Sequence, residues 1–275
     1  MSVPTHVNDS VEALVQAIQD GSFKNQDARQ VDFAPLVRRA QTDPSFRPFK
    51  GAQFSGTNLT GQRFPGMDFT GATLDGVDLT EAVLIEAIFD FVNFTQATLN
   101  RAFMSGTSLM DAYIYGAKLR EVDLSASNLS SAILATADLT KARLNKAELM
   151  CVAFHRACLN DANLTGANLV GADLTEASLR EANLTDVDLE PIKACMVADF
   201  TGVIVNPGTR AGLNLLKQAA FVAPNLKGVV RRGAIEAFAL HGETLAFTPC
   251  PKPPPPTRDE GLSALESGST KQYPR

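Results

Sequence analysis

The sequence contains no tryptophan, few other aromatic residues and only four cysteines among its 275 residues. The cysteines show neither the CxxC spacing of zinc sites nor the density of a disulfide scaffold, so a reducing compartment, the cytoplasm, is expected. Positive charge is also scarce, because 25 Lys and Arg stand against 30 Asp and Glu. This mildly acidic balance offers no basic surface, and direct nucleic-acid binding is not expected.

Long hydrophobic runs and catalytic motifs are missing as well. No apolar run approaches the ~20 residues of a membrane-spanning helix, and the N-terminus lacks the basic and apolar regions of a signal peptide. No phosphate-binding Gly-rich loop, HExxH or GxSxG motif is present. We therefore expect no membrane-spanning segment and no catalytic residue, and we interpret the chain as not an enzyme.

A repeat of five residues dominates the middle of the chain. From Phe54 to Leu189, every fifth residue is large and apolar, without a polar interruption. Two positions earlier stands a small residue, mostly Ala, and the exceptions other than Val are Thr57, Gln62, Met67, Thr107 and Ser127. A period of five fits neither an α-helix, with 3.6 residues per turn, nor a strand, whose side chains alternate.

Five residues with two inward positions describe one side of a coil that turns a corner at each repeat. Four such sides close a square of about 20 residues. The pattern predicts an all-β solenoid, a right-handed quadrilateral β-helix of about seven coils over residues 50–190, stacked at the ~4.8 Å spacing of neighbouring strands. In this register Cys151, His155 and Cys158 leave from three successive sides and cannot converge, so neither a metal nor a cofactor is expected.

The repeat motif, A-[D/N]-L-x-x, resembles that of the pentapeptide-repeat family. It reads ADLTK at 137–141, ANLTG at 162–166 and ANLTD at 182–186. The resemblance covers about residues 50–190 and implies the β-helical fold, but this fold family hosts many unrelated functions. Some bacterial members protect DNA gyrase against quinolones and resemble a DNA duplex in shape and charge, and others are secreted effectors.

The flanking segments are expected to cover the ends of the solenoid. Helical patterns at 10–21, with Ser10 as N-cap and Gly21 as stop, and at 33–41 predict a partly helical N-terminal cap over 1–49. Residues 191–247 are expected to form a C-terminal cap, with a shifted coil at 198–205 and helices at 209–221 and 228–240. The Pro-rich, polar residues 248–275 are predicted to be a disordered tail, whose role stays open.

Positions twenty apart should stack, so the register sorts the outward residues by side. Asp and Asn recur one residue before the large apolar residue, where we interpret them as supports of the corners through hydrogen bonds to the backbone. One side, here called the acidic side, carries charges of only one sign: Asp68, Asp90, Asp111, Glu148, Asp188 and Glu190. A mimic of duplex DNA, with one charge per ~1.7 Å, would need about 20 negative charges over this length. Six such residues argue against strong mimicry, and whether the acidic side is functional stays open.

Some outward positions hold apolar residues where polar ones are expected, and a contiguous apolar patch indicates an interaction surface. The predicted site comprises one corner with its neighbouring coil and a polar rim: Val83, Ile85, Ile88, Phe91, Phe103 and Met110, with Asp90 and Asp111. Two interpretations stay open. The patch is either a docking or homodimer surface, or it is covered by a flank or the tail of the same chain.

The favoured functional hypothesis is a non-enzymatic protein–protein interaction scaffold that uses the rigid surface of the β-helix. Its protein partner is not identified by the sequence, and a bacterial, cytoplasmic setting is expected. One alternative is a DNA-mimicking protein that binds topoisomerase (gyrase) and confers quinolone protection. The other alternative is a secreted bacterial effector.

Overall fold

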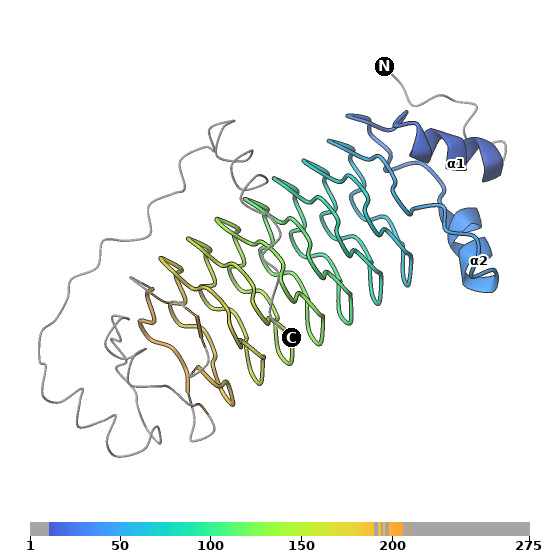
Figure 1. Cartoon of the computed structure of the whole chain (residues 1–275). Coiled ribbons are helices and arrows are strands. Elements are labelled where there is room, and N and C mark those ends of the chain that lie inside the picture. Colours follow the sequence, from blue (N-terminus) through green and yellow to red (C-terminus); the bar gives the residue numbers. More distant parts are fainter. Residues whose placement is uncertain (1–10, 190–191, 194, 196–197, 206–208, 210–275) are drawn as a thin grey trace, which may run out of the picture. The chain divides into compact units, whose positions relative to one another are not determined.

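The computed structural model describes residues 11–189, 192–193, 195, 198–205 and 209. Within them, two short helices precede a stack of coils (Figure 1). Helix α1 spans Val11–Gln19 and helix α2 spans Ala34–Thr42. Ser10, the predicted disordered tail and, apart from Thr209, the two helices expected at 209–221 and 228–240 lie outside the described residues.

The stack of coils is a β-helix whose coils contain twenty residues each. Single-residue parallel bridges join residues twenty apart along four ladders, whose first bridges within the repeats are Gln53↔Thr73, Asn58↔Asp78, Arg63↔Val83 and Asp68↔Ile88. Four ladders within twenty residues leave five residues for each side. The period of five therefore corresponds to the side of a coil, and the predicted β-helical solenoid is confirmed.

Each side ends in a tight turn, which is closed by a backbone hydrogen bond and supported by an Asp or Asn side chain. After the inward Leu139, the N–H of Ala142 donates to the Leu139 carbonyl at 2.9 Å. Lys141, the third residue of this turn, has a φ of +61°, which is typical of a type II turn. The carboxylate of Asp138 accepts the N–H of Thr140 at 3.0 Å. The same bond recurs at Asp and Asn residues along the coils, which confirms their role as supports of the corners.

The core is a narrow column along the axis of the β-helix. Every large apolar position of the repeat from Phe54 to Leu189 is buried, as are the small inward positions except the half-buried Gln62. Phenylalanine fills much of the N-terminal part, where the rings of Phe69 and Phe89 stack at 5.0 Å. Each coil can bury its inward face only against its neighbours, so the core is continuous from coil to coil.

The N-terminal segment attaches to the first coil through backbone pairing. Gly21, with a φ of +78°, ends α1, and the following N–H of Ser22 donates to the Ala17 carbonyl as in a Schellman motif. The parallel bridge Asp27↔Asn58 then adds one more residue to the end of a ladder. As a result, part of the edge of the first coil is paired with the chain that precedes it, which reduces the exposed edge of the β-helix.

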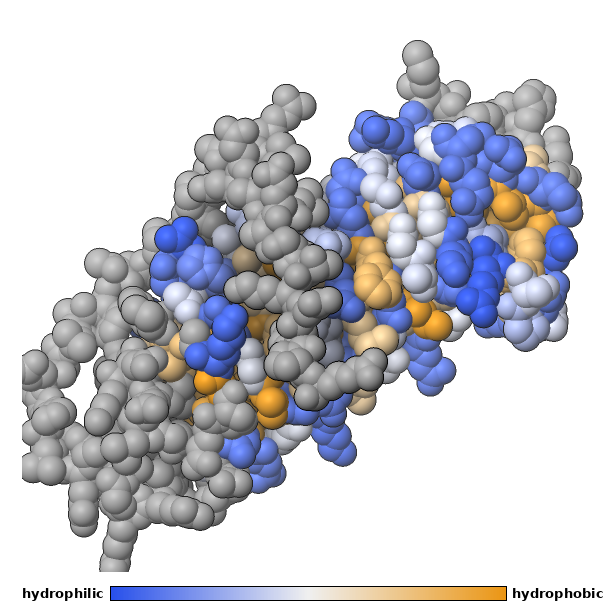
Figure 2. Space-filling model, in the orientation of Figure 1, coloured by the Kyte–Doolittle hydropathy of each residue, from blue (hydrophilic) through white to orange (hydrophobic). Residues whose placement is uncertain are grey.

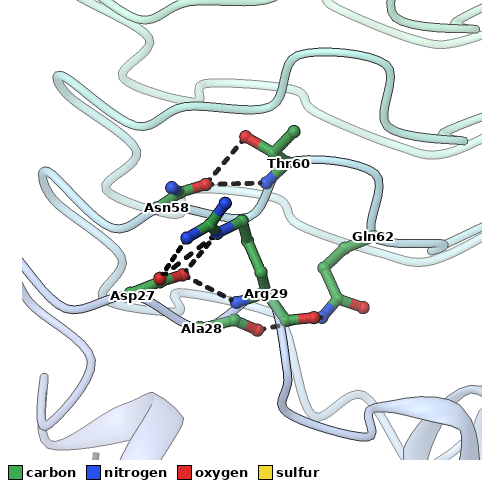
Figure 3. A network of polar contacts seen from close by, with 6 residues as sticks. All are labelled: Asp27, Ala28, Arg29, Asn58, Thr60 and Gln62. Atoms are coloured by element: carbon green, nitrogen blue, oxygen red, sulfur yellow. Dashed lines mark hydrogen bonds and ion pairs between the residues drawn. The ribbon is translucent and has the colours of Figure 1, made fainter. Parts of the chain in front are cut away.

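Two polar residues at small inward positions mark this attachment. The hydroxyl of Thr57 donates to the Phe23 carbonyl at 2.6 Å. The side-chain amide of Gln62 donates to the carbonyl of Ala28 at 2.9 Å (Figure 3) and to the carbonyl of Val31 at 3.0 Å. These exceptions to the small apolar rule therefore satisfy backbone carbonyls of the N-terminal segment.

At the other end, the register shifts by one residue. The bridges Ser178↔Asp199 and Asn183↔Ile204 join residues 21 apart instead of twenty. Ala198 is buried as a small inward residue of this shifted coil, in the segment where the sequence suggested one. Neither helix in the described part of the chain is long and apolar enough to cross a membrane.

Candidate functional site

The predicted apolar residues lie at the surface of the β-helix. Their fractional exposures run from 37% at Met110 to 59% at Phe91, whereas Val83 is half-buried. We call the six residues the apolar patch: Val83, Ile85, Ile88, Phe91, Phe103 and Met110. In the face drawn in Figure 2, hydrophobic side chains reach the surface between hydrophilic ones.

The apolar patch spans two corners, so the expectation of a single corner is wrong. Ile85 is the first turn residue after the inward Leu84, and Phe91 is the second turn residue after the inward Phe89. Ile88 lies on the side between these corners. The physical reason is that the chain turns after every five residues, so residues 85 and 91 cannot share one turn. The patch therefore covers the acidic side, which carries Ile88, and both corners of that side, and it extends to Val83 and Phe103 on the preceding side.

Phe91 occupies an unfavourable backbone conformation. Its φ is +57°, in the left-handed region that bulky residues avoid. Elsewhere in the repeats this turn position holds glycine, charged residues or small and polar ones, and no other aromatic residue. Phe91 combines backbone strain with the highest exposure of any large hydrophobic residue in the described part of the chain. Neither property stabilises the fold.

The two predicted rim residues lie beside the patch. The Asp90 carboxylate accepts the hydroxyl of Ser108 at 2.6 Å and the N–H of Met110 at 3.1 Å. Asp111 is exposed and forms no ion pair with any described residue. The patch thus has fixed and free carboxylates at its border, which present negative charge to any molecule that binds there.

One cation reaches the acidic side from outside the repeats, which corrects the register-based expectation of acidic charges alone. Arg47, from the segment after α2, forms an ion pair with Asp68 at 2.9 Å. Burial alone would raise the pKa of Asp68, but hydrogen bonds from Thr70 and the nearby Arg47 guanidinium outweigh it, and the pKa is lowered. Sequence register could not show this pairing, because Arg47 precedes the repeats.

The same N-terminal segment borders the patch without covering it. A groove lined by Pro44, Arg47 and Pro48 on one wall reaches Met67 and Ile88 on the other. Ile88 nevertheless remains 38% exposed. The described part of the N-terminal segment therefore does not bury the apolar patch, and the groove continues the patch toward the first coil.

Comparison with protein families assigns the repeats. The family model of pentapeptide repeats matches in eight copies, at residues 49–85, 87–125, 117–150 and 157–190. Through these repeats, the chain belongs to the pentapeptide-repeat family. A search of curated proteins finds no match.

The solved structures that match the chain include pentapeptide-repeat proteins. HetL, a protein involved in heterocyst differentiation regulation from the cyanobacterium Nostoc sp. strain PCC 7120, is 26% identical, with a TM-score of 0.37; the match covers 71% of this chain and 98% of HetL. QnrB1, a plasmid-mediated fluoroquinolone resistance protein, is 21% identical with a TM-score of 0.32, over 57% of this chain and 76% of QnrB1. A thylakoid lumen protein of Arabidopsis thaliana is 29% identical with a TM-score of 0.21, over 44% of this chain and 71% of the plant protein.

The pentapeptide-repeat coils expose two apolar residues that the sequence reasoning missed. Met150 is 40% exposed and Val170 is 41% exposed. Both occupy the same turn position as Met110, which lies forty residues before Met150 in the twenty-residue register. That spacing was the available signal, and Ser130 at the intervening coil obscured it. We call Phe91, Met110, Met150 and Val170 the corner column.

Hydrogen bonds between neighbouring coils show that the corners of the corner column stack directly on one another. The N–H of Phe91 donates to the Met110 carbonyl at 2.9 Å, and the N–H of Cys151 donates to the Val170 carbonyl at 2.8 Å. Between them, the N–H of Asp111 donates to Ser130 and the N–H of Ser131 donates to Met150. The two apolar pairs are therefore separated by one polar coil.

The other sides of the pentapeptide-repeat domain carry charges of both signs that pair between coils. The five ion pairs within the described repeats and the shifted coil are Arg101–Glu81, Arg120–Asp138, Arg143–Asp123, Arg156–Glu176 and Arg180–Asp199. Their N···O distances lie between 2.6 and 3.6 Å. None of the five involves Asp90, Asp111 or Glu148, so these three carboxylates of the acidic side differ in pairing from those of the other sides.

Proposed function

We propose that this pentapeptide-repeat protein is a non-enzymatic scaffold that binds a partner protein through the apolar patch. The observation that carries the proposal is the exposure of Ile88 and Phe91 on a fold whose other outward positions are mostly polar. Each large apolar side chain left in water forgoes roughly 1.5–3 kcal/mol of burial. A binding surface supplies the burial that the fold itself does not.

The geometry of the coil favours this role. Parallel bridges and turn hydrogen bonds hold each corner on both sides, so the side chains of the patch project from a repetitive, well-supported backbone. Binding to such a surface requires little ordering of the backbone, which reduces the entropic cost of association. Asp90 and Asp111 supply a polar rim around an apolar centre, the usual arrangement of a protein interface.

Charge density argues against the alternative of a DNA mimic. Duplex DNA carries one charge per ~1.7 Å, far more than the acidic side offers. Asp68 on that side is neutralised by Arg47, and cations alternate with anions on the other sides. A gyrase supercoiling assay, with and without a quinolone, tests this alternative, and protection of gyrase by the purified chain would overturn the preference stated here.

A pull-down experiment tests the scaffold hypothesis. The intact chain and the double variant Ile88→Ser with Phe91→Ser are used as baits, and captured proteins are identified and then rebound in purified form. We expect the variant to fold normally and to lose the partner, because its two removed side chains are exposed. The matched control is Ile204→Ser, which removes a 55% exposed side chain outside the patch. Retention of the same purified partner by the double variant would contradict the proposal.

A further inference from the structure

We propose that the corner column, together with the acidic side, binds a basic amphipathic helix of the partner, lying along the axis of the β-helix. This inference rests on the proposed function and adds the class of ligand. It also adds Met150 and Val170 to the binding surface, which extends it beyond the apolar patch. The argument uses spacing, charge and continuity of the column.

The spacing of the column fits a helix. Neighbouring coils stack at about 4.8 Å, so Met110 and Met150, two coils apart, are separated by about 10 Å along the axis. Residues seven apart on one face of an α-helix are separated by about 10.5 Å. In an extended strand, side chains on one face repeat at about 6.6 Å and do not match this separation. The column from Phe91 to Val170 covers four coil steps, or roughly 19 Å, which corresponds to about 13 helical residues.

The charges beside the column determine the sign of the ligand. Asp90, Asp111 and Glu148 lie on the acidic side beside the column, and Glu86 lies at the other corner of that side, where Lys146 occupies the same turn position three coils further along. Within the described residues, none of these four carboxylates forms an ion pair with a lysine or arginine. On the other sides, comparable carboxylates are paired with arginines of neighbouring coils. A helix with Lys or Arg beside its apolar stripe would complete the pairing that this side lacks.

Hydrogen bonds hold two of these carboxylates in place. Asp90 accepts bonds from Ser108 and from the N–H of Met110, so it stays next to the apolar column. Glu148, which lies two residues before Met150, accepts a hydrogen bond from the side-chain amide of Asn168 at 2.7 Å. Each apolar pair of the column therefore has a positioned carboxylate beside it. An apolar column with acidic groups beside it complements an amphipathic helix that carries Lys or Arg beside its apolar face.

The test uses a designed peptide as the probe. A fluorescent 14-residue peptide with leucines at helical i, i+3, i+4 and i+7 spacing and lysines beside them, about the length of the column, is titrated with the intact chain, and binding is followed by fluorescence anisotropy. Two control peptides have the same composition in scrambled order, or glutamate in place of lysine. We expect the amphipathic basic peptide alone to bind, with an affinity that falls as salt is added.

Variants of the chain then locate the binding surface. Met150→Ser with Val170→Ser should weaken peptide binding at least tenfold without changing the thermal unfolding midpoint. Asp111→Asn with Glu148→Gln should weaken it and reduce its salt dependence. Ile204→Ser, the matched control, should bind like the parent chain. Equal binding of the scrambled peptide, or equal loss with Ile204→Ser, would overturn the inference.

The outcomes separate this inference from the proposed function. If the pull-down partner is lost on Ile88→Ser with Phe91→Ser but Met150→Ser with Val170→Ser has no effect on peptide or partner, the scaffold stands and the helix-binding column is wrong. If sedimentation shows a dimer that the Met150 and Val170 substitutions dissociate, a second copy occupies the column instead, and the partner helix is overturned.

Discussion

The acidic side and the side that carries Lys118 and Asp138, called here the polar side, are built on the same five-residue repeat. On the polar side and its corners, charges of both signs alternate, and Arg120 pairs with Asp138 and Arg101 with Glu81 between coils. On the acidic side, exposed apolar residues lie beside Asp90, Asp111 and Glu148, which form no ion pair with any described residue. The backbone is the same on both sides, so the repeat constrains the inward and turn residues and leaves the outward ones free. Departures from a solvated surface therefore indicate function.

The largest expected effect is a loss of stability on replacing a buried leucine, and it should be equal beneath both sides because they share one core. Leu139, beneath the polar side, and Leu109, beneath the acidic side, are both fully buried. Replacement of either by Asp should unfold the chain or abolish soluble expression, because an unpaired buried carboxylate costs several kcal/mol. Circular dichroism and thermal melting measure this, and a soluble variant with an unchanged midpoint at one site would show that the sides differ inside.

A smaller effect is expected at the small inward positions. Ala137→Leu beneath the polar side and Ala87→Leu beneath the acidic side should each destabilise the fold by roughly 1–3 kcal/mol through overpacking, because stacked coils cannot spread apart locally. The exposed neighbour Lys141→Leu should be nearly neutral. Urea unfolding measures all three, and equal midpoints for the Ala and Lys variants would refute the inward assignment.

Replacing a corner residue that has a positive φ by glycine separates its contribution to stability from its contribution to binding. Phe91→Gly should leave stability unchanged or raise it by up to about 1 kcal/mol, because glycine adopts the φ of +57° without strain. The same variant should lose the partner or the peptide probe. Arg101→Gly, at φ +56° on the polar side, relieves similar strain and loses only an exposed ion pair with Glu81. A marked loss of stability in Phe91→Gly would assign Phe91 a structural role instead.

The smallest expected effect is a change in how stability depends on pH at low pH. It involves Asp27, which forms a backbone bridge with Asn58 at the N-terminal end of the polar side. The hydrogen bond from the Arg29 side chain, with the N–H of Arg29 and the nearby charge, lowers the pKa of Asp27 from 3.8 to about 2. A lowered folded-state pKa contributes stability above the unfolded value, and this share is lost as pH falls from about 4 to about 2. Asp27→Asn removes the share, so its stability should fall less steeply than that of the parent chain across this window. Urea midpoints at several pH values measure the slopes, and parallel slopes would contradict the assignment.

Much of the fold was predictable because the repeat is long and regular. An unbroken apolar series such as that from Phe54 to Leu189 can be buried by only one register, and the structure has that register. The helix bounds were also close, since Gly21 and the apolar spacing of 33–41 are local signals. The polar exceptions Thr57 and Gln62 could not be explained beforehand, because their partners are carbonyls of the N-terminal segment.

The candidate site was predictable only in part. Outward apolar residues such as Ile88 and Phe91 follow directly from the register, and their exposure agrees with it. The assignment of the patch to one corner failed because residues 85 and 91 lie in two successive turns, with one side of the coil between them. Met150 and Val170 were missed because Ser130 interrupts their column, and a short polar gap hides a surface that continues in space.

The sequence by itself determined which residues face the axis and where the chain turns, because a five-residue period, small residues and Asp or Asn at the corners act locally and identically in every coil. Only the tertiary structure decided what stands next to what between distant segments. It shows that Arg47 forms an ion pair with Asp68 and that Gln62 donates to the carbonyls of Ala28 and Val31. It also shows that Phe91 and Val170 lie in the same stack of corners. These neighbours result from stacking and from the path of the N-terminal segment, which depend on the whole coil and not on any single repeat.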